Sequence, residues 1–140
     1  DTSDAVAAQL RDAGMNVRRT VLPGNTFWND WAGYPFSTTD WAQRPLGVQV
    51  LALAYRSGEA WNETAFSNAE FDATLTEALA IADADERRAV SERLQTIMQE
   101  EGVIIQPYWR STCRHYRPGL IGAEQQPTFE IHVYKLGIAA

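Results

Sequence analysis

Cys113 and His115 are the residue types in this sequence best suited to chemistry. If residues 110–116 form a strand, both side chains lie on one face, where they could hold a metal ion or act as nucleophile and base. The chain has only one other histidine, His132, whereas zinc usually takes three or four protein ligands. A packed cysteine beside a surface histidine is therefore the favoured interpretation.

Two pairs of acidic residues could serve general acid–base catalysis: Asp83 with Asp85, and Glu100 with Glu101. Both pairs fall at expected helix ends, and capping accounts for Asp85 near a helix N-terminus. The sequence lacks a hydrolase nucleophile elbow, a Walker loop, a dinucleotide fingerprint and an HExxH motif. We therefore expect no enzymatic activity, no metal and no cofactor.

Tryptophan is the more informative residue type, with five in 140 residues. Such side chains either fill a core or form a wall for an apolar or amphipathic ligand, which the indole N–H groups help to orient. Trp41 and Trp61 are the better wall candidates because each lies in polar loop sequence, beside Arg44 or Asn62. Residues 62–64 also match a glycosylation acceptor, a short pattern that is frequent by chance.

The overall composition restricts the class of partner. Apolar residues make up 45% of the chain and charged residues 21%, which suits a globular protein. The net charge of −6 argues against nucleic acid, since this surface repels phosphate. No run of eighteen apolar residues exists, so we expect no direct membrane insertion.

The first forty residues are predicted to form a helix, a strand and a short helical turn. Spacing predicts a helix over residues 5–13, ended by Gly14, and then a strand over residues 15–22. One helical turn should carry Phe27, Trp28 and Trp31. This order is typical of the middle of a β-α-β unit and suggests a fragment of a longer protein.

The rest of the chain predicts a helical pair followed by extended segments. Residues 46–55 are apolar enough for a buried strand or a helix, and periodicity does not decide between them. A capping box over residues 67–70 begins one helix, and Asp85 caps a second that ends at Gly102. Three further segments are predicted to be extended: a strand over residues 103–109, a basic stretch over 110–117, and a loosely alternating strand over 129–139.

Two stretches of the sequence resemble a known family. DTSDAVAAQLRDAGMNVRRTVLP is similar to the helix–glycine–strand segment in the second lobe of family 5 extracellular solute-binding proteins. WAQRP, followed by YRSGEAWNETAFSNAEFDATLTEALAIADADERRAVSERLQTIMQEEGVIIQPYW, resembles their C-terminal part. The resemblance covers nearly the whole chain and depends on the order and spacing of motifs that are individually loose.

The resemblance implies an α/β fold, the C-terminal lobe of a type II periplasmic binding protein, with helices packed on a small mixed sheet. Residues 1–140 would form a single partial domain, and residues 119–140 would return toward the first lobe. Such proteins are substrate-binding components of ABC importers, periplasmic or extracellular and membrane-associated. They capture a peptide or other small solute in a cleft between lobes and deliver it to a membrane permease.

The resemblance and the loop positions together indicate the ligand-binding residues: Trp41, Arg44, Tyr55, Trp61 and Asn62. Peptide-binding relatives carry an aspartate after the loop tryptophan, which pairs with the amino terminus of the ligand. If Arg44 holds that place, the local charge is inverted, and a guanidinium prefers a carboxylate or phosphate. We therefore expect Arg44 to face an anionic group with Trp41 stacked on it. The structural alternative is an ion pair between Arg44 and Asp40.

Two other functions fit the same residues less well. A protein-interaction domain without a transport role would use its exposed aromatic side chains as a docking patch. An enzyme would have to depend on Cys113 and His115, without a recognisable catalytic set.

Overall fold

The computed structural model of the protein describes residues 1–126 and 129–139. Within them, five α-helices accompany one two-stranded sheet, which agrees with the predicted mixture of helix and strand. The chain divides into two units, one of residues 1–40 and one beginning at Trp41. The single partial domain over residues 1–140 stays a prediction, as does the return of residues 119–140 to another lobe. Residues 127, 128 and 140 of that segment lie outside the described residues.

Helix α1 (Thr2–Asp12) begins with a reciprocal cap. The Asp1 carboxylate accepts from the Asp4 amide at 2.9 Å, while the Asp1 amino group donates to the Asp4 carboxylate at 3.1 Å. Both contacts satisfy polar groups that the first helical turn leaves unpaired. Gly14 follows the helix with a φ of 88°. The predicted helix and its terminating glycine are thus confirmed.

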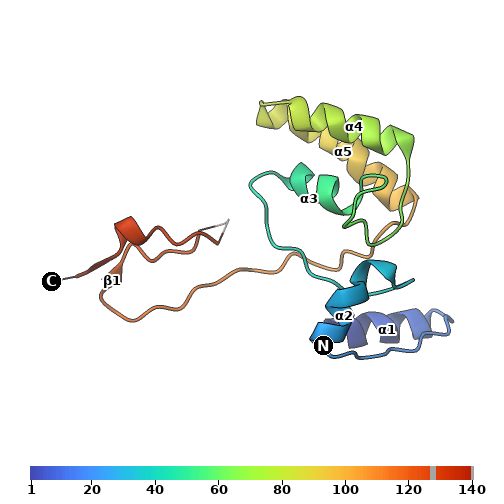
Figure 1. The fold of residues 1–140 in the computed structure, drawn as a ribbon, viewed down its shortest axis with the longest axis horizontal. Coiled ribbons are helices and arrows are strands. Elements are labelled where there is room, and N and C mark those ends of the chain that lie inside the picture. The colour runs from blue at the N-terminus through green and yellow to red at the C-terminus, as the bar shows by residue number, and fades with distance from the viewer. Residues whose placement is uncertain (127–128, 140) are drawn as a thin grey trace. The chain divides into compact units, whose positions relative to one another are not determined.

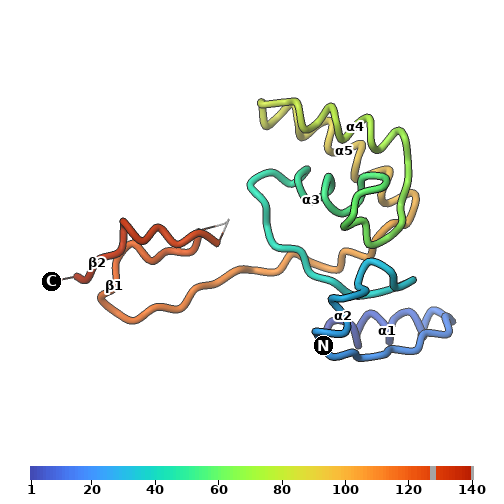
Figure 2. The backbone as a smooth tube through the Cα atoms, in the orientation of Figure 1, coloured from blue at the N-terminus to red at the C-terminus, as the bar shows by residue number. Residues whose placement is uncertain are grey.

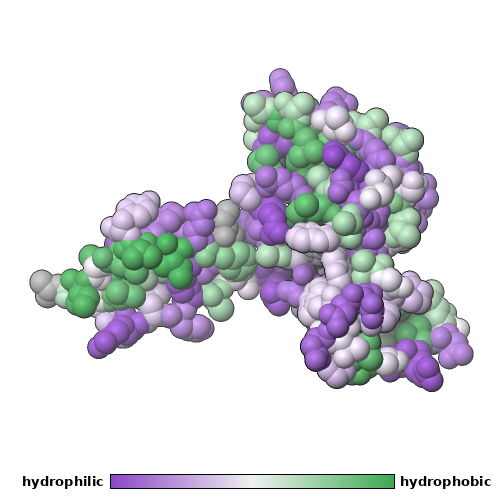
Figure 3. Space-filling view, viewed as in Figure 1, coloured by the Kyte–Doolittle hydropathy of each residue, from purple (hydrophilic) through white to green (hydrophobic). Residues whose placement is uncertain are grey.

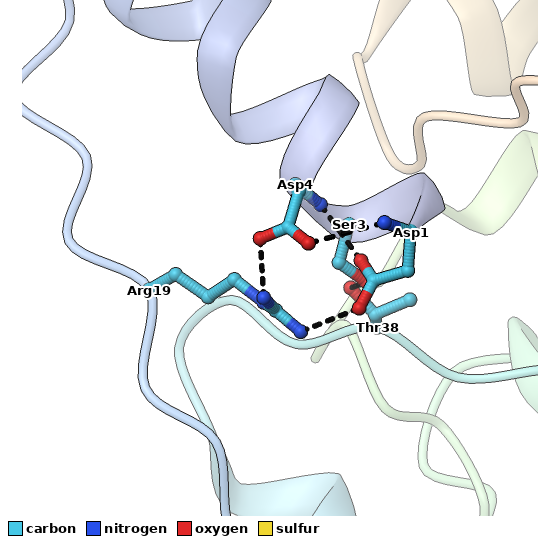
Figure 4. Close-up of polar contacts among 5 residues, drawn as sticks. All are labelled: Asp1, Ser3, Asp4, Arg19 and Thr38. Atoms are coloured by element: carbon cyan, nitrogen blue, oxygen red, sulfur yellow. Dashed lines mark hydrogen bonds and ion pairs between the residues drawn. The ribbon is translucent and has the colours of Figure 1, made fainter.

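The predicted strand over residues 15–22 is wrong, because the structure has neither strand nor helix there. Side chains bind this segment to α1 instead. Arg11 donates to the Val17 carbonyl at 2.8 Å, and Arg19 bonds Asp4 as well as Asp1, the latter at 2.8 Å. Figure 4 shows Arg19 between the two carboxylates. A strand needs a neighbouring strand for its backbone hydrogen bonds, and these arginine contacts do not supply one.

An aromatic cluster occupies the second half of the first unit. Helix α2 (Gly24–Asp30) and the 3₁₀ turn η1 (Trp31–Gly33) confirm the predicted helical turn. Phe27 stacks on Tyr34 with ring centroids 5.5 Å apart and meets Trp28 edge-on at 5.0 Å. These pairs join the two short elements through aromatic packing.

The second unit contains a three-helix core built from α3 (Gly47–Ala54), α4 (Ala69–Ala80) and α5 (Ala84–Glu100). Residues 46–55, which periodicity left ambiguous, are therefore mostly helical. Helix α4 packs on both α3 and α5, and the antiparallel α4–α5 pair is visible in Figure 1. The buried residues of the core are Val48, Ala54, Tyr55, Phe71, Leu75, Ala78, Leu94, Ile97 and Met98.

Both helices of the α4–α5 pair were predicted, but each cap is displaced from its predicted residue. The Asn68 side chain accepts from the Phe71 amide at 3.0 Å and caps α4. Asp83, rather than Asp85, caps α5 by accepting from the amides of Asp85 and Glu86 at 2.9 Å. The backbone conformation decides which residue is the cap, because an N-cap residue lies just outside the helix with extended φ and ψ.

A small hairpin lies near the C-terminus. Strands β1 (Leu120–Ile121) and β2 (Gly137–Ile138) are antiparallel, with Leu120 opposite Ile138, and the turn η2 (Val133–Lys135) precedes β2. Only residues 137–138 of the strand predicted over 129–139 form one. Figure 2 labels both strands, and Figure 3 shows apolar atoms gathered over this segment. Its most exposed aliphatic side chains are Ile121, Ile131, Val133 and Ile138.

Residues 103–117 connect α5 to the hairpin without forming a helix or a strand. The strand predicted over 103–109 is therefore wrong. Residues 110–117, which were predicted to be extended, also form no strand. Within the described residues the sheet is a single antiparallel pair, and the helical core includes no residue from it. The predicted packing of helices on a mixed sheet is thus replaced by helix-on-helix packing.

Candidate functional site

A loop between α3 and α4, residues 56–66, is braced by the side chain of Asn62. The amide nitrogen of Asn62 donates to the carbonyl oxygens of Arg56 and Phe66, at 3.1 Å and 2.8 Å. Its amide oxygen accepts from the backbone nitrogen and the hydroxyl of Thr64, at 3.3 Å and 3.1 Å. One side chain thus joins both ends of the loop and one residue between them.

The loop is also anchored to α4. The Ser57 amide donates to the Asp72 carboxylate at 3.1 Å, which fixes the start of the loop. At its end, Phe66 meets the fully buried Phe71 edge-on, with ring centroids 5.2 Å apart. Polar bonds at one end and aromatic packing at the other therefore give residues between them a defined position.

Two tryptophans and one glutamate meet beside this loop. The Trp41 indole nitrogen donates to a carboxylate oxygen of Glu63 at 2.9 Å. The Trp41 and Trp61 rings are inclined at 54°, with centroids 6.0 Å apart. Trp41 is partly buried against the helical core, whereas Trp61 is 49% exposed. We call these three residues the Trp–Glu cluster. It presents an aromatic surface to solvent beside an acidic group.

The predicted site residues Trp41, Trp61 and Asn62 are brought to this loop, and Tyr55 lies in the core next to it. Tyr55 is only 5% exposed. Burial, with a smaller contribution from the charge of Glu63, raises the pKa of Tyr55 to about 12. The sequence predicts Tyr55 as a ligand-binding residue, whereas in this structure its side chain packs inside the helical core.

Arg44 follows Trp41 in the loop before α3 and is partly buried. Its guanidinium donates to the carbonyl oxygens of Ala42 and Gln43, at 3.2 Å and 3.4 Å. These weak bonds within its own loop hold the side chain near the backbone. Ligand contact remains a prediction for Arg44 and for the other four residues.

Glu63 is the member of the cluster that sequence reasoning missed. It lies within Asn62-Glu63-Thr64, which was interpreted only as a glycosylation pattern of little weight. A single glutamate in a polar loop belongs to no helical or strand periodicity that would mark it. The signal that could have found it is its position two residues after Trp61, in a loop that also holds Asn62.

Outside this loop, the residue types best suited to chemistry form no metal centre within the described part of the chain. Cys113 and His115 are both exposed, in the irregular segment 103–117. Within residues 1–126 and 129–139, no group of three or more histidine, cysteine or acidic side chains could hold a metal ion. In the same residues, no helix has the length and apolar character needed to cross a bilayer.

Comparisons with known proteins do not place the chain in a family. No protein-family model, no curated protein and no solved structure matches it.

Proposed function

We propose that the protein is the substrate-binding component of an ABC importer. It captures a peptide or other small solute in an interlobe cleft, in the periplasm or outside the cell at the membrane, and delivers the solute to a membrane permease. It performs no chemistry on that solute.

The observation that carries this proposal is the Trp–Glu cluster on its braced loop. Binding sites for small solutes combine aromatic surface with a few polar groups held in place before the ligand arrives. Trp61 supplies half-exposed aromatic surface, and Trp41 orients the Glu63 carboxylate through its indole N–H. The order of sequence motifs that resembles family 5 solute-binding proteins supports the same function.

Arg44 gives the proposal a chemical preference. A guanidinium binds carboxylate or phosphate through two parallel hydrogen bonds. Its present partners are neutral carbonyls at 3.2 Å and 3.4 Å, and an anionic ligand group offers stronger bonds than these. We propose that Arg44 binds an acidic group of the solute.

Native mass spectrometry of the protein, purified from its own host without refolding, tests the function. A small solute of defined mass, bound in stoichiometric amount and released on denaturation, is the expected result. If neither this experiment nor a thermal-shift screen of peptides and small acids detects a ligand, the proposal fails.

One observation favours a second candidate, a protein-interaction domain. In segment 103–117, Trp109 is 89% exposed and Ile105 is 53% exposed, an unusual position for large apolar side chains. Under this alternative the aromatic side chains dock a protein partner. Exchange of Trp109 for serine would then abolish a protein contact and leave solute binding unchanged.

A further inference from the structure

The peptide group between Arg56 and Ser57 is held at both of its polar ends. Its carbonyl oxygen accepts from the side-chain nitrogen of Asn62 at 3.1 Å and from the Glu59 amide at 3.3 Å. Its N–H donates to the Asp72 carboxylate at 3.1 Å. Because a peptide group is planar, bonds at its opposite ends fix the direction in which the whole group points. Asp72 of α4 is thus connected to Asn62 through a single peptide group.

Asp72 differs from the other two partners because it lies outside loop 56–66. The bonds from Glu59 and Asn62 fix the internal shape of the loop, whereas the bond to Asp72 fixes its start relative to a helix of the core. Gly58 comes directly after this peptide group, with a φ of 76° and no atom within 4 Å of an added Cβ. Glycine adopts many conformations at little steric cost. The Asp72 bond therefore limits the directions in which the loop can leave its first residues.

The end of the loop is strained. Ala65 has a φ of 54°, a conformation that residues with a side chain rarely adopt. The surrounding bonds impose it, because the Phe66 carbonyl accepts from Asn62 at 2.8 Å and the Phe66 amide donates to the Thr64 hydroxyl at 3.3 Å. Strain of this kind persists only where neighbouring groups enforce it, and it is found disproportionately at ligand sites. The loop conformation therefore depends on Asn62, and Asn62 depends on the peptide group that Asp72 holds.

We infer that Asp72 is a positioning residue of the solute site. It acts through the Arg56–Ser57 peptide group on Asn62, and so holds the neighbouring Trp61 in the orientation that receives the solute. A side chain that is already oriented loses less conformational freedom when the solute binds, which strengthens binding. This inference rests on the proposed function, which makes Trp61 part of the ligand wall.

The competing role for Asp72 is to stabilise α4, because an acidic side chain in the first helical turn interacts favourably with the helix dipole. Asp72→Asn and Asp72→Ala separate the two roles. Both remove the negative charge, but only asparagine retains a side-chain oxygen that can accept from the Ser57 amide. Val90→Ala is the control for lost stability, because Val90 is an α5 residue partly buried against the same core and lies outside the loop.

Two-dimensional NMR tests whether Asp72 positions the loop. The Trp61 indole and Asn62 side-chain resonances are assigned by their loss in Trp61→Leu and Asn62→Ala. We expect Asp72→Ala to shift both resonances and to speed hydrogen exchange of the Ser57 amide by at least about fivefold. Asp72→Asn and Val90→Ala should keep both resonances and the slow exchange. Unchanged Trp61 and Asn62 resonances in Asp72→Ala would overturn the inference.

The solute that co-purifies with the protein tests the consequence for binding. Each variant is purified from the same host without refolding and dialysed, and native mass spectrometry follows the fraction of protein that still carries the solute. Asp72→Ala should lose the solute at least about fivefold faster than the parent protein, because changes at a site act mainly on dissociation. Asp72→Asn and Val90→Ala should lose it at the parental rate.

The outcomes separate this inference from the proposed function. Parental retention of the solute by Asp72→Ala, or equally fast loss from Asp72→Asn and Asp72→Ala, overturns the inference and leaves the function intact. If the parent protein carries no solute and the thermal-shift screen detects none, the function fails. The NMR comparison then still decides whether Asp72 positions Trp61.

Discussion

The amide nitrogen of Asn62 donates to the carbonyl oxygen of Phe66 at 2.8 Å and closes the loop that carries Trp61 and Glu63. Asn62→Ala removes this bond and the three others made by the same side chain, and leaves carbonyl oxygens of a part-buried loop without their donor. We expect the free energy of unfolding to fall by about 1–3 kcal/mol, measured by urea denaturation. Gln43→Ala, at an exposed position, is the control and should stay within about 0.5 kcal/mol. Equal effects of the two changes would show that Asn62 does not brace the loop.

The Arg44 guanidinium, if it binds an acidic ligand group, should matter for affinity and little for folding. Arg44→Ala should weaken binding of the native solute by about tenfold or more, as expected for lost hydrogen bonds to a charged group. Isothermal titration calorimetry measures the change. Arg88→Ala, which removes the same charge from an exposed side chain on α5, should leave affinity unchanged. Unchanged affinity in Arg44→Ala would remove the anion site from the proposal.

Asp83 caps α5, and the amides of Glu86 and Asp85 that donate to its carboxylate hold its pKa below the usual range. A carboxyl group with a lowered pKa in the folded state adds stability above its unfolded pKa, and this stability is lost as the pH falls through the folded value. We therefore expect Asp83→Ala to lower the thermal midpoint at neutral pH and to have less effect in acid. Calorimetry at both pH values checks this. Asp85→Ala should have the smaller effect at neutral pH, and the opposite ranking would restore Asp85 as the cap.

The pKa of Tyr55 is shifted in the opposite direction to that of Asp83. Its pKa is raised from 10.0 to about 12, first by burial and then by the charge of Glu63. Because the folded state holds the phenol proton more tightly, the contribution of Tyr55 to stability is complete below the unfolded pKa and is lost as the pH rises through the folded value. Absorbance titration of tyrosinate should show one late-ionising group that Tyr55→Phe removes. Glu63→Gln should lower the pKa of this group, and an unchanged titration would place Glu63 too far away to act on it.

Gly122 lies where the backbone closely approaches that of Lys135, inside the C-terminal hairpin. A methyl group added there would lie 2.0 Å from the backbone oxygen of Lys135, and the φ of 74° already disfavours other residues. Gly122→Ala should disrupt the pairing of β1 with β2, seen as loss of the cross-strand contact between Leu120 and Ile138 in NMR spectra. Gly119→Ala shares a positive φ but meets no atom within 4 Å, so it should retain the contact. Loss of pairing in both variants would assign the effect to backbone strain alone.

The α4–α5 pair could be predicted from sequence because its determinants are local. The side chains that cap each helix lie within three residues of the amides they bind, and the apolar stripe repeats along one helix. Ser67 and Asn68 are both good cap residues, so only the backbone conformation could select Asn68. Strands are harder to predict, because a strand depends on a partner that its own residues do not specify. The failures at residues 15–22 and 103–109 have this cause.

The candidate site was predictable only in part, for a related reason. Trp41, Trp61 and Asn62 were identified because aromatic and amide side chains stand out in a loop. The burial of Tyr55 depends on helices that meet its ring from elsewhere in the sequence. The role of Glu63 depends on an indole twenty-two positions earlier, a separation that no local pattern records.

The cap at Asp83 also bears on the order in which the chain acquires its structure. Asp83 and Arg87, which donates to the carbonyl oxygens of Ile81 and Ala82 at 2.7 Å and 3.2 Å, join the end of α4 to the start of α5. Every one of these contacts spans six residues or fewer, so closing them costs little chain entropy, and local contacts of this kind form quickly. The α4–α5 pair should therefore be the nucleus around which α3 and the loop of the Trp–Glu cluster subsequently assemble.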